Sequence, residues 1–382
     1  MRVVWITHNY PRFAGDVAGA FLHPLAVALR EAGIDIRVVA PSDAGQGGDA
    51  PLDGVPVRRV RYGRASDERL AYQGTMMDAM KSPRGALAFH RLRGALRAGA
   101  EAELAGAGAG ALVHAHWWVP SGLAAPTSVP MVLTCHGTDV RLLDRIPLAA
   151  WLARPTFRRA RVVTTVSAAL AAIVRRRVGI EIATDAVQPM PVASVPRPWT
   201  DGSGGAVVVG RLTSQKRVHL AIEAIAIAHS RGESLTLTIV GDGPTRPALE
   251  ELAGRLGVSN LVRFAGAVPS GNVPGYFATA RCCLMPALGE GFGLAAAEAL
   301  MQGVPVVACL DGGGLTDIVP ASGAGRLVPA AGDAVASAMI ELVCDAAAGD
   351  LARKAGERWR ELLSPPAVAQ RCLTWYRRAL DA

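Results

Sequence analysis

Glu290-Gly-Phe-Gly-Leu-Ala-Ala-Ala-Glu298 places two carboxylates eight residues apart. The apolar run Arg281–Pro286 before it predicts a buried strand, and the alanine-rich stretch that ends at Glu298 predicts a helix, so the order is strand, loop, helix. Unpaired N–H groups at a helix N-terminus bind anions, and loop glycines let a ligand approach the backbone closely. Because Glu290 would repel an anion, its carboxylate must contact another part of the ligand. The stretch therefore suggests a nucleotide-sugar, which carries both phosphate and hydroxyl groups.

Around this stretch, short β-branched runs alternate with helical stretches in both halves of the chain. They begin with Val3–Thr7 in the first half and with Ala206–Val209 in the second. Strands that are apolar throughout and separated by helices are typical of parallel sheets covered on both faces. The chain has 382 residues, which suits two domains of about 150–200 residues each. We predict an α/β protein of two doubly wound, Rossmann-like domains whose parallel sheets face across a cleft, with residues 41–54 forming a loop.

The alternation breaks once, between Gln188 and Gly205, where a run of prolines is followed by a Gly/Ser cluster. Proline removes backbone donors and glycine loosens the chain, so this segment predicts a linker. We expect a first domain over residues 1–196, a second over residues 197–365, and a C-terminal helix over residues 366–382 that packs back on the first. A ligand would bind outside the carboxyl ends of the strands.

Two cations flank the turn that follows the strand Ala206–Val209. They are Arg211 and Lys216, and Lys216 stands out because only three of the 40 basic residues are lysines. Together with the dipole of the helix that follows, they would hold a diphosphate. The alternative is an ordinary solvated basic turn.

Further glycine turns follow strands in the second half. Gly241 ends the strand Leu237–Val240, and the segment Arg263–Val268 leaves its strand through a glycine. We interpret Gly241, Arg263 and Val268 as a backbone rim for a nucleotide base. A third glycine-rich loop spans Gly312–Asp317, and no G-x-G-x-x-G follows the first strand, so we expect no dinucleotide cofactor.

Four of the eight histidines lie at or just beyond predicted strand ends of the first half: His8, His114, His116 and His136. A single histidine is more often structural, whereas four on one rim favour a functional role for at least one. We select His136, because Gly137 follows it and the polar pair Thr138–Asp139 would orient it.

Other candidates in the first half lie on the same predicted rim. Gly15 and Asp16 belong to a glycine-containing loop after the first strand. Trp117 and its neighbour Trp118 either stack on a sugar or seal the rim. We take Asp16, His116, Trp117 and Asp139 as acceptor-side candidates.

The sequence predicts no metal site. The histidines lack ligand partners at close spacing, and no Asp-x-Asp follows a strand. The charge of a diphosphate would then be neutralised by Arg211, Lys216 and helix N-termini, without Mg²⁺.

This pattern resembles the retaining glycosyltransferases of family 4, which have the GT-B fold, over nearly the whole chain. Glu290 and Glu298 match the family's E-x7-E signature. The resemblance implies that Glu290 and His136 act near the donor sugar and that Glu298 binds the ribose. It also implies that the diphosphate is bound by two cations and a set of loop residues, namely Arg211, Lys216, Gly15, Phe292, Gly293 and Leu294.

Two positions depart from the family pattern. Asp16 follows Gly15 where many relatives have a second glycine, and a carboxylate beside a phosphate is costly unless it points to the acceptor. Thr316–Asp317 replaces the usual Pro-Glu after Gly314, which leaves the role of that loop open.

The resemblance implies transfer of a sugar from a nucleotide-diphosphate sugar to a saccharide or lipid-linked saccharide, with retention of configuration, in cell-surface polysaccharide or glycoconjugate synthesis. The first domain would bind the acceptor and the second the donor. The alternative is a non-catalytic nucleotide-sugar-binding or scaffolding relative.

The net charge of +8 admits several anionic partners. Nucleic acid is disfavoured, because aromatic residues are only 5% of the chain and the basic clusters are scattered. The basic amphipathic segment Ser82–Arg97 either lies on an anionic membrane surface or packs on the sheet as an ordinary arginine-rich helix.

The remaining features bear on location. We expect a cytoplasmic protein, because the N-terminus reads as a strand and not as a signal peptide, and no apolar run is long enough to span a membrane. The six cysteines include no C-x-x-C pair, which fits free thiols in a reducing compartment.

Overall fold

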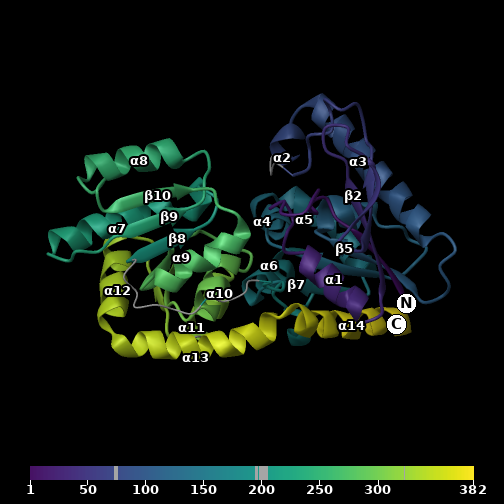
Figure 1. Cartoon of the computed structure of the whole chain (residues 1–382). Coiled ribbons are helices and arrows are strands. Elements are labelled where there is room, and N and C mark those ends of the chain that lie inside the picture. Colours follow the sequence, from purple (N-terminus) through teal and green to yellow (C-terminus); the bar gives the residue numbers. More distant parts are fainter. Residues whose placement is uncertain (73–75, 194–196, 198–204, 322) are drawn as a thin grey trace. The chain divides into compact units, whose positions relative to one another are not determined.

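The computed structural model describes residues 1–72, 76–193, 197, 205–321 and 323–382. It divides into two compact units (Figure 1): unit 1 comprises Met1–Pro191 and Ser364–Ala382, and unit 2 comprises Val192–Leu363. Unit 2 begins a few residues before the predicted boundary at 196/197, because the Val192 N–H donates to the Leu363 carbonyl at 3.0 Å. Most of the predicted linker, at residues 194–196 and 198–204, lies outside the described residues.

Unit 1 is built on a seven-stranded sheet of order β3-β4-β2-β1-β5-β6-β7. Its central strands are buried on both faces, which is why they pair in parallel. All neighbouring pairs are parallel except β3 with β4. The strands are β1 Arg2–Ile6, β2 Asp35–Pro41, β3 Gly48–Leu52, β4 Val55–Val60, β5 Ala111–His116, β6 Met131–Cys135 and β7 Val162–Thr165.

Strand β3 corrects the prediction of a loop over residues 41–54. It pairs antiparallel with β4 through the turn Asp53–Gly54, where both residues have positive φ. An Asp-Gly pair is the usual sequence of such two-residue hairpin turns. The strand was missed because most of its side chains are exposed, so it carries no apolar alternation.

Helix α3 packs on the sheet of unit 1, with Leu92 and Leu96 fully buried. A Cβ on Gly99 would lie 2.7 Å from Val60 and 2.8 Å from Val39, so the helix contacts the strands closely. Of the two interpretations of residues 82–97, the structure therefore favours the arginine-rich helix packed on the sheet, since Leu92 and Leu96 are used inside the protein. The helices of unit 1 are α1 His23–Glu31, α2 Met76–Ala79, α3 Pro83–Leu104, α4 Thr138–Arg145, α5 Pro147–Arg159, α6 Ala168–Val178 and α14 Pro365–Asp381.

The C-terminal helix α14 belongs to unit 1, although it follows unit 2 in the chain. It packs against α1, and its Tyr376 is fully buried. The Tyr376 hydroxyl accepts a hydrogen bond from Trp5 Nε1 at 3.1 Å and lies 2.8 Å from His114 Nδ1. These bonds tie the end of the chain to β1 and β5, at the centre of the sheet.

Unit 2 is built on a six-stranded sheet of order β10-β9-β8-β11-β12-β13, in which all neighbouring strands are parallel. The strands are β8 Ala206–Val209, β9 Leu237–Val240, β10 Val262–Gly266, β11 Cys282–Met285, β12 Val306–Cys309 and β13 Arg326–Val328. The helices are α7 Val218–Ser230, α8 Arg246–Arg255, α9 Val273–Thr279, α10 Leu294–Met301, α11 Leu315–Ala321, α12 Gly332–Cys344 and α13 Ala346–Leu363.

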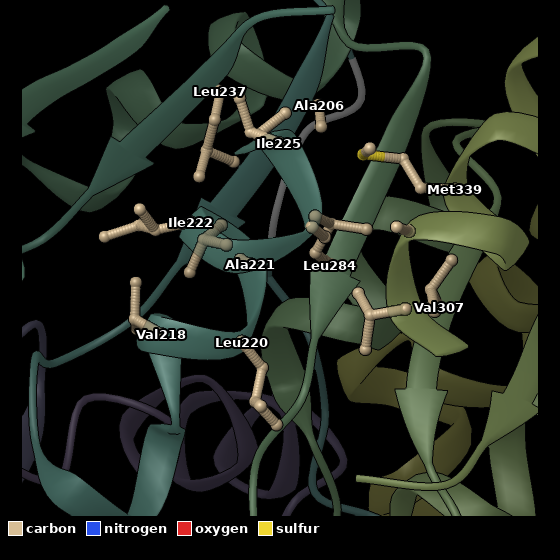
Figure 2. Close-up of a cluster of buried hydrophobic side chains, with 14 of the residues drawn as sticks. Ala206, Val218, Leu220, Ala221, Ile222, Ile225, Leu237, Leu284, Val307 and Met339 are labelled. Carbon is tan, nitrogen blue, oxygen red and sulfur yellow. The ribbon is translucent and has the colours of Figure 1, made fainter. Parts of the chain in front are cut away.

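The core of unit 2 lies where α7 and α12 pack beside each other on this sheet. Figure 2 shows α7 side chains, among them Ile222 and Ile225, beside the strand residues Leu237 and Leu284 and Met339 of α12. Burial of this apolar surface holds the strands in parallel register. Their carboxyl ends therefore meet at one edge, where the candidate site lies. None of the helices in the described ranges is long and apolar enough to cross a membrane.

The buried hydrogen bond between Trp5 and Tyr376 is expected to stabilise the fold. Replacing Tyr376 with Phe leaves the Trp5 N–H buried without its acceptor, so we expect the free energy of unfolding to fall by about 1–3 kcal/mol. Urea titration followed by circular dichroism measures the change. Tyr276→Phe is the control, because no hydrogen bond to that hydroxyl occurs among the described residues. Equal midpoints for the two variants would contradict the role of the Tyr376 hydroxyl.

Candidate active site

Helix α10 begins at the carboxyl edge of the unit 2 sheet, directly after the loop that carries Glu290. Gly293 caps this end with φ +97°, and a Cβ there would lie 2.3 Å from Leu315. The N–H groups of Gly293, Leu294 and Ala295 donate to no backbone carbonyl within the described part of the chain. Such unpaired donors at a helix N-terminus bind anions.

Lys216 and Glu290 are brought together at this edge. Lys216 Nζ lies 3.0 Å from Glu290 Oε1, and the Gln215 amide donates to the same oxygen at 3.2 Å. Both side chains of the ion pair are largely buried, at 22% and 14% exposed. The Lys216 side chain lies over Gly210, whose built Cβ would be 3.4 Å from its Cε, so the cation lies at the end of β8.

Arg211 differs from Lys216 in having an exposed side chain. It forms no ion pair with any carboxylate among the residues that the structure describes. Its guanidinium is therefore available to a ligand without first breaking an internal bond.

The second signature carboxylate, Glu298, lies one turn into α10 and is half-buried. Burial raises its pKa to about 7. No hydrogen bond or ion pair to its carboxylate occurs among the described residues. Glu298 thus has unused hydrogen-bonding capacity at a position that water reaches poorly, which suits a ligand hydroxyl.

The glycine loop after β12 binds the backbone of the Glu290 loop. The Glu290 N–H donates to the Gly312 carbonyl at 3.0 Å, and the Gly314 N–H donates to the Glu290 carbonyl at 2.9 Å. A Cβ on Gly313 would lie 2.5 Å from that same Glu290 oxygen. This third glycine loop therefore holds Glu290 in place, a role that the sequence left open.

A bidentate ion pair links the Lys216 turn to the same glycine loop. Arg217 Nη1 and Nη2 lie 3.0 and 2.8 Å from the two Asp311 oxygens. Arg217 caps α7 with φ +48°, and its hydrogen bond to Asp311 raises its pKa. Sequence reasoning missed this pair, because the two residues are far apart in the chain and belong to no motif.

The three residues predicted to bind a base do not lie together. Gly241 follows β9 with φ +133°, and a Cβ there would lie 2.0 Å from the Gly210 carbonyl, so it joins two turns at the carboxyl edge. Val268 also follows its strand. Arg263, by contrast, pairs with Thr238 near the amino ends of β10 and β9, and its guanidinium lies 5.7 Å from the Tyr276 ring. Arg263 therefore does not belong to this edge.

In unit 1, three of the four predicted histidines pair with other side chains. His116 Nδ1 lies 3.0 Å from His136 Nε2. His114 bonds Tyr376 and Thr134 and so serves the core. Burial lowers the pKa of His8 to about 4 and that of His114 to about 3, and it holds those of His116 and His136 well below the usual value. These imidazoles are therefore neutral at pH 7.

Asp139 acts on the backbone around His136. Its buried carboxylate accepts N–H bonds from His136, Gly137 and Trp118 at 3.1–3.2 Å, and burial raises its pKa. It therefore fixes the turn after β6 and does not bond the imidazole. Trp117 has φ +68°, and its ring lies 4.3 Å from the His136 ring.

A cavity of about 230 Å³ opens at the carboxyl ends of β1, β5 and β6. The imidazole Nδ1 of His8 and the Oδ1 of Asn9 are buried without a partner among the described residues. Polar and aromatic side chains of this kind suit a hydroxylated ligand. The cavity is lined by His8, Asn9, Leu70, Tyr72, Met76, Met77, Trp117, Val119, Thr138, Asp139 and Leu142.

The loop after β1 shows why Asp16 is tolerated. Although burial opposes it, hydrogen bonds from Arg12 and from the Arg12 and Ala18 N–H groups lower the pKa of Asp16 to about 2. Its carboxylate is thus used within the loop, and the structure does not present it to an acceptor. Gly15 is exposed with φ +87°, whereas Gly19 is the sterically required glycine, since a Cβ there would lie 2.2 Å from the Asn9 carbonyl.

The sequence matches two family models. "Glycosyl transferases group 1" matches residues 204–345, and "Glycosyl transferase 4-like domain" matches residues 18–192, so together they span most of both units. The chain belongs to the group 1 glycosyltransferases. This glycosyltransferase has the GT-B fold, with one Rossmann-like sheet in each unit.

Individual relatives agree with this assignment. The glycosyltransferase is 30% identical over 214 residues to the 2-deoxystreptamine glucosyltransferase of Streptomyces kanamyceticus, which covers 50% of this chain and 55% of that one. Among solved structures, it resembles the sucrose-phosphate synthase of Thermosynechococcus elongatus, with a TM-score of 0.79, 20% identity and coverage of 100% and 99%. It also resembles Anabaena HepE in complex with UDP-glucose, with a TM-score of 0.65, 17% identity and coverage of 100% and 98%.

The glycosyltransferase contains no group of three His, Cys, Asp or Glu side chains that could hold a metal ion within its described residues. The cations at the carboxyl edge of unit 2 are instead arginine and lysine side chains.

The contact between Gly313 and Glu290 can be tested by adding a single methyl group. We expect Gly313→Ala to lose about 1–3 kcal/mol more stability than Gly257→Ala, because only the first places a Cβ against backbone atoms. Both glycines have similar φ, +63° and +70°, so the conformational strain is matched. Urea titration of the two variants measures the difference. Equal losses would mean that the loop contact is not tight.

The raised pKa of Glu298 predicts a pH dependence of stability. The carboxyl proton of Glu298 is bound more tightly in the folded state than in the unfolded state. The contribution of Glu298 to the free energy of unfolding is therefore greatest below about pH 4 and falls as pH rises through 7. We expect the stability of the wild type relative to Glu298→Gln to decrease by about 1–3 kcal/mol between pH 5 and 8. Urea titrations of both proteins across that range provide the measurement. A pH-independent difference would show that Glu298 titrates normally.

Proposed function

We propose that this glycosyltransferase moves a sugar from a nucleotide-diphosphate sugar to a hydroxyl of a saccharide or lipid-linked saccharide, with retention of configuration and without a metal ion. The observation that carries the proposal is the Lys216–Glu290 ion pair beside the free N-terminus of α10. It places a cation, anion-binding amides and a carboxylate within one small region. HepE, which shares the fold, has been solved with UDP-glucose, and this supports a nucleotide-sugar as donor.

We assign the diphosphate to the cations and amides of unit 2. Arg211 is exposed and unpaired in the described structure, and the Phe292, Gly293 and Leu294 N–H groups face no backbone acceptor there. Lys216 would contact the phosphate while it remains close to Glu290. Fixed donors of this kind stabilise the charge that develops on a leaving phosphate, and removing one typically costs about 10²–10³ in kcat.

We assign the hydroxyl groups of the donor to the two glutamates. Glu290 would accept hydrogen bonds from the sugar, because its contacts with Lys216 and Gln215 orient the carboxylate. Glu298 would accept from the ribose hydroxyls, which would supply the partners that its half-buried carboxylate lacks. Donor binding is then expected to lower the pKa of Glu298, since hydrogen bonds to a carboxylate favour its charged form.

For the chemical step we propose front-face attack. The bond between the anomeric carbon and the phosphate oxygen breaks, the acceptor oxygen bonds to that carbon on the same face, and the acceptor proton passes to the leaving phosphate. His136 would position the sugar, since its low pKa keeps the imidazole neutral and its Nε2 is already bonded to His116. The acceptor is assigned to unit 1, where the cavity beside Trp117 combines apolar and aromatic side chains with the polar groups of His8, Asn9 and Thr138.

Lys216 provides the main test. We expect Lys216→Ala to reduce the release of nucleotide diphosphate by about 10²–10³-fold, because it removes a phosphate contact and leaves Glu290 without its counter-charge. We expect Arg211→Ala to reduce the release of nucleotide diphosphate as well. Lys354→Ala is the control, since this lysine is exposed on α13 and should have no effect. Full activity of Lys216→Ala would refute the phosphate role.

The donor can be identified by thermal shift with UDP-, GDP- and ADP-sugars, since a ligand that binds the folded state raises the Tm. The alternative, a non-catalytic nucleotide-sugar-binding relative, predicts stabilisation by one of these donors with no turnover when hydroxylated acceptors are screened. Turnover that persists in EDTA would support catalysis without a metal ion.

A further inference from the structure

Helix α5 of unit 1 (Figure 1) has two apolar faces, of which the protein buries only one. The buried face consists of Ala149, Ala150, Ala153, Thr156 and Phe157. The opposite face carries Leu148, Trp151 and Leu152, which are 62%, 63% and 51% exposed. Residues at i, i+3 and i+4 lie on one side of a helix, so these three form a continuous surface.

Ile146, 43% exposed, directly precedes α5 and is a fourth exposed apolar side chain in this segment. We call Ile146, Leu148, Trp151 and Leu152 the α5 patch. Single exposed apolar side chains such as Leu256 or Leu351 are normal on a protein surface. Four in one short segment, including a tryptophan, are typical of an interaction site. Helix α3 shows the contrast, because Leu92 and Leu96, at helical spacing, are buried in the core.

The charged side chains of α5 and its flanking residues are all positive, and the acid that precedes them, Asp144, is already paired with Arg176 and Arg177. The segment from Arg145 to Arg161 contains five arginines and no acidic residue. Arg145, Arg154 and Arg158 are exposed and form no ion pair in the described parts of the chain. Arg154 and Arg158 follow Trp151 along the same side of the helix, so they border the apolar surface.

We propose that α5 docks this unit onto an anionic lipid bilayer, with the α5 patch in the headgroup region and Arg145, Arg154 and Arg158 against lipid phosphates. A helix with an apolar face bordered by arginines lies in the plane of the interface. Tryptophan is favoured at that level, because its ring is apolar and its N–H remains hydrated. A protein partner with an apolar surface would not account for three unpaired arginines without an acid among them. The proposal concerns location and does not depend on the transfer reaction.

The test is co-sedimentation of the full chain with vesicles of phosphatidylcholine alone and of phosphatidylcholine with phosphatidylglycerol. We expect binding to the anionic vesicles that weakens at higher salt. The triple variant Leu148→Ser, Trp151→Ser, Leu152→Ser should lose binding by about tenfold or more. The variant Arg145→Gln, Arg154→Gln, Arg158→Gln should lose the preference for anionic lipid. Leu351→Ser, and Leu87→Ser on α3, are controls that should bind like the wild type.

A second measurement locates the contact if the triple variant folds poorly. Lipids brominated near the headgroup should quench wild-type tryptophan fluorescence, and Trp151→Phe should bind equally well but lose most of that quenching. Failure of the wild type to bind anionic vesicles, or unchanged quenching in Trp151→Phe, would overturn the proposal. So would a lipid-free dimer in analytical ultracentrifugation that the triple variant abolishes, since the patch would then bind a second copy. Because sedimentation and quenching require no donor, their failure is distinct from loss of glycosyltransferase activity.

Discussion

At the carboxyl edge of the unit 2 sheet, backbone touches backbone. Gly313 lies against the Glu290 carbonyl and Gly241 lies against the Gly210 carbonyl, with no room for a Cβ at either contact. These contacts join the four loops, which follow separate strands, in two pairs, and the Leu288 N–H, which donates to the Gln215 carbonyl at 2.8 Å, links the pairs. The Glu290 carboxylate, the Lys216 ammonium and the N-terminus of α10 owe their positions to these contacts. Because these hydrogen-bonding and charged groups are fixed before a ligand arrives, binding does not have to order them.

On this surface the two signature glutamates have different environments. Glu290 is paired with Lys216 and accepts a hydrogen bond from Gln215, so its side chain is held in one position. Glu298 has no such partner in the described residues, and burial raises its pKa to about 7. A difference in environment between two carboxylates separates their roles. The paired group is suited to bind the reacting sugar, and the unpaired one is suited to a diol that completes its hydrogen bonding.

At the carboxyl ends of the unit 1 strands the histidines are neutral, in contrast to the Lys216–Glu290 ion pair of unit 2. Three sets of hydrogen bonds lie near the ends of the buried strands. They are the bond between His136 and His116, the bond between His114 and Tyr376, and the bonds that the Asp139 carboxylate accepts from backbone N–H groups. Burial favours the uncharged imidazoles, which donate and accept hydrogen bonds without attracting a phosphate. This suits the binding of a hydroxylated acceptor. The arginines that border α5 lie by contrast at the surface of unit 1.

The sequence by itself determined the two parallel-sheet units and the family, and it pointed to the residues of the candidate site in unit 2, because apolar strand patterns and the E-x7-E spacing are local signals. Tertiary structure alone decided which residues meet. Arg217 and Asp311 are distant in the chain and pair only because β8 and β12 share a sheet edge. Asp16 is compensated by Arg12, and Arg263 lies at the wrong end of its strand. Periodicity also could not tell which amphipathic helix faces inward. Residues 82–97 and α5 carry similar patterns, but only packing on the sheet determines which apolar stripe is buried.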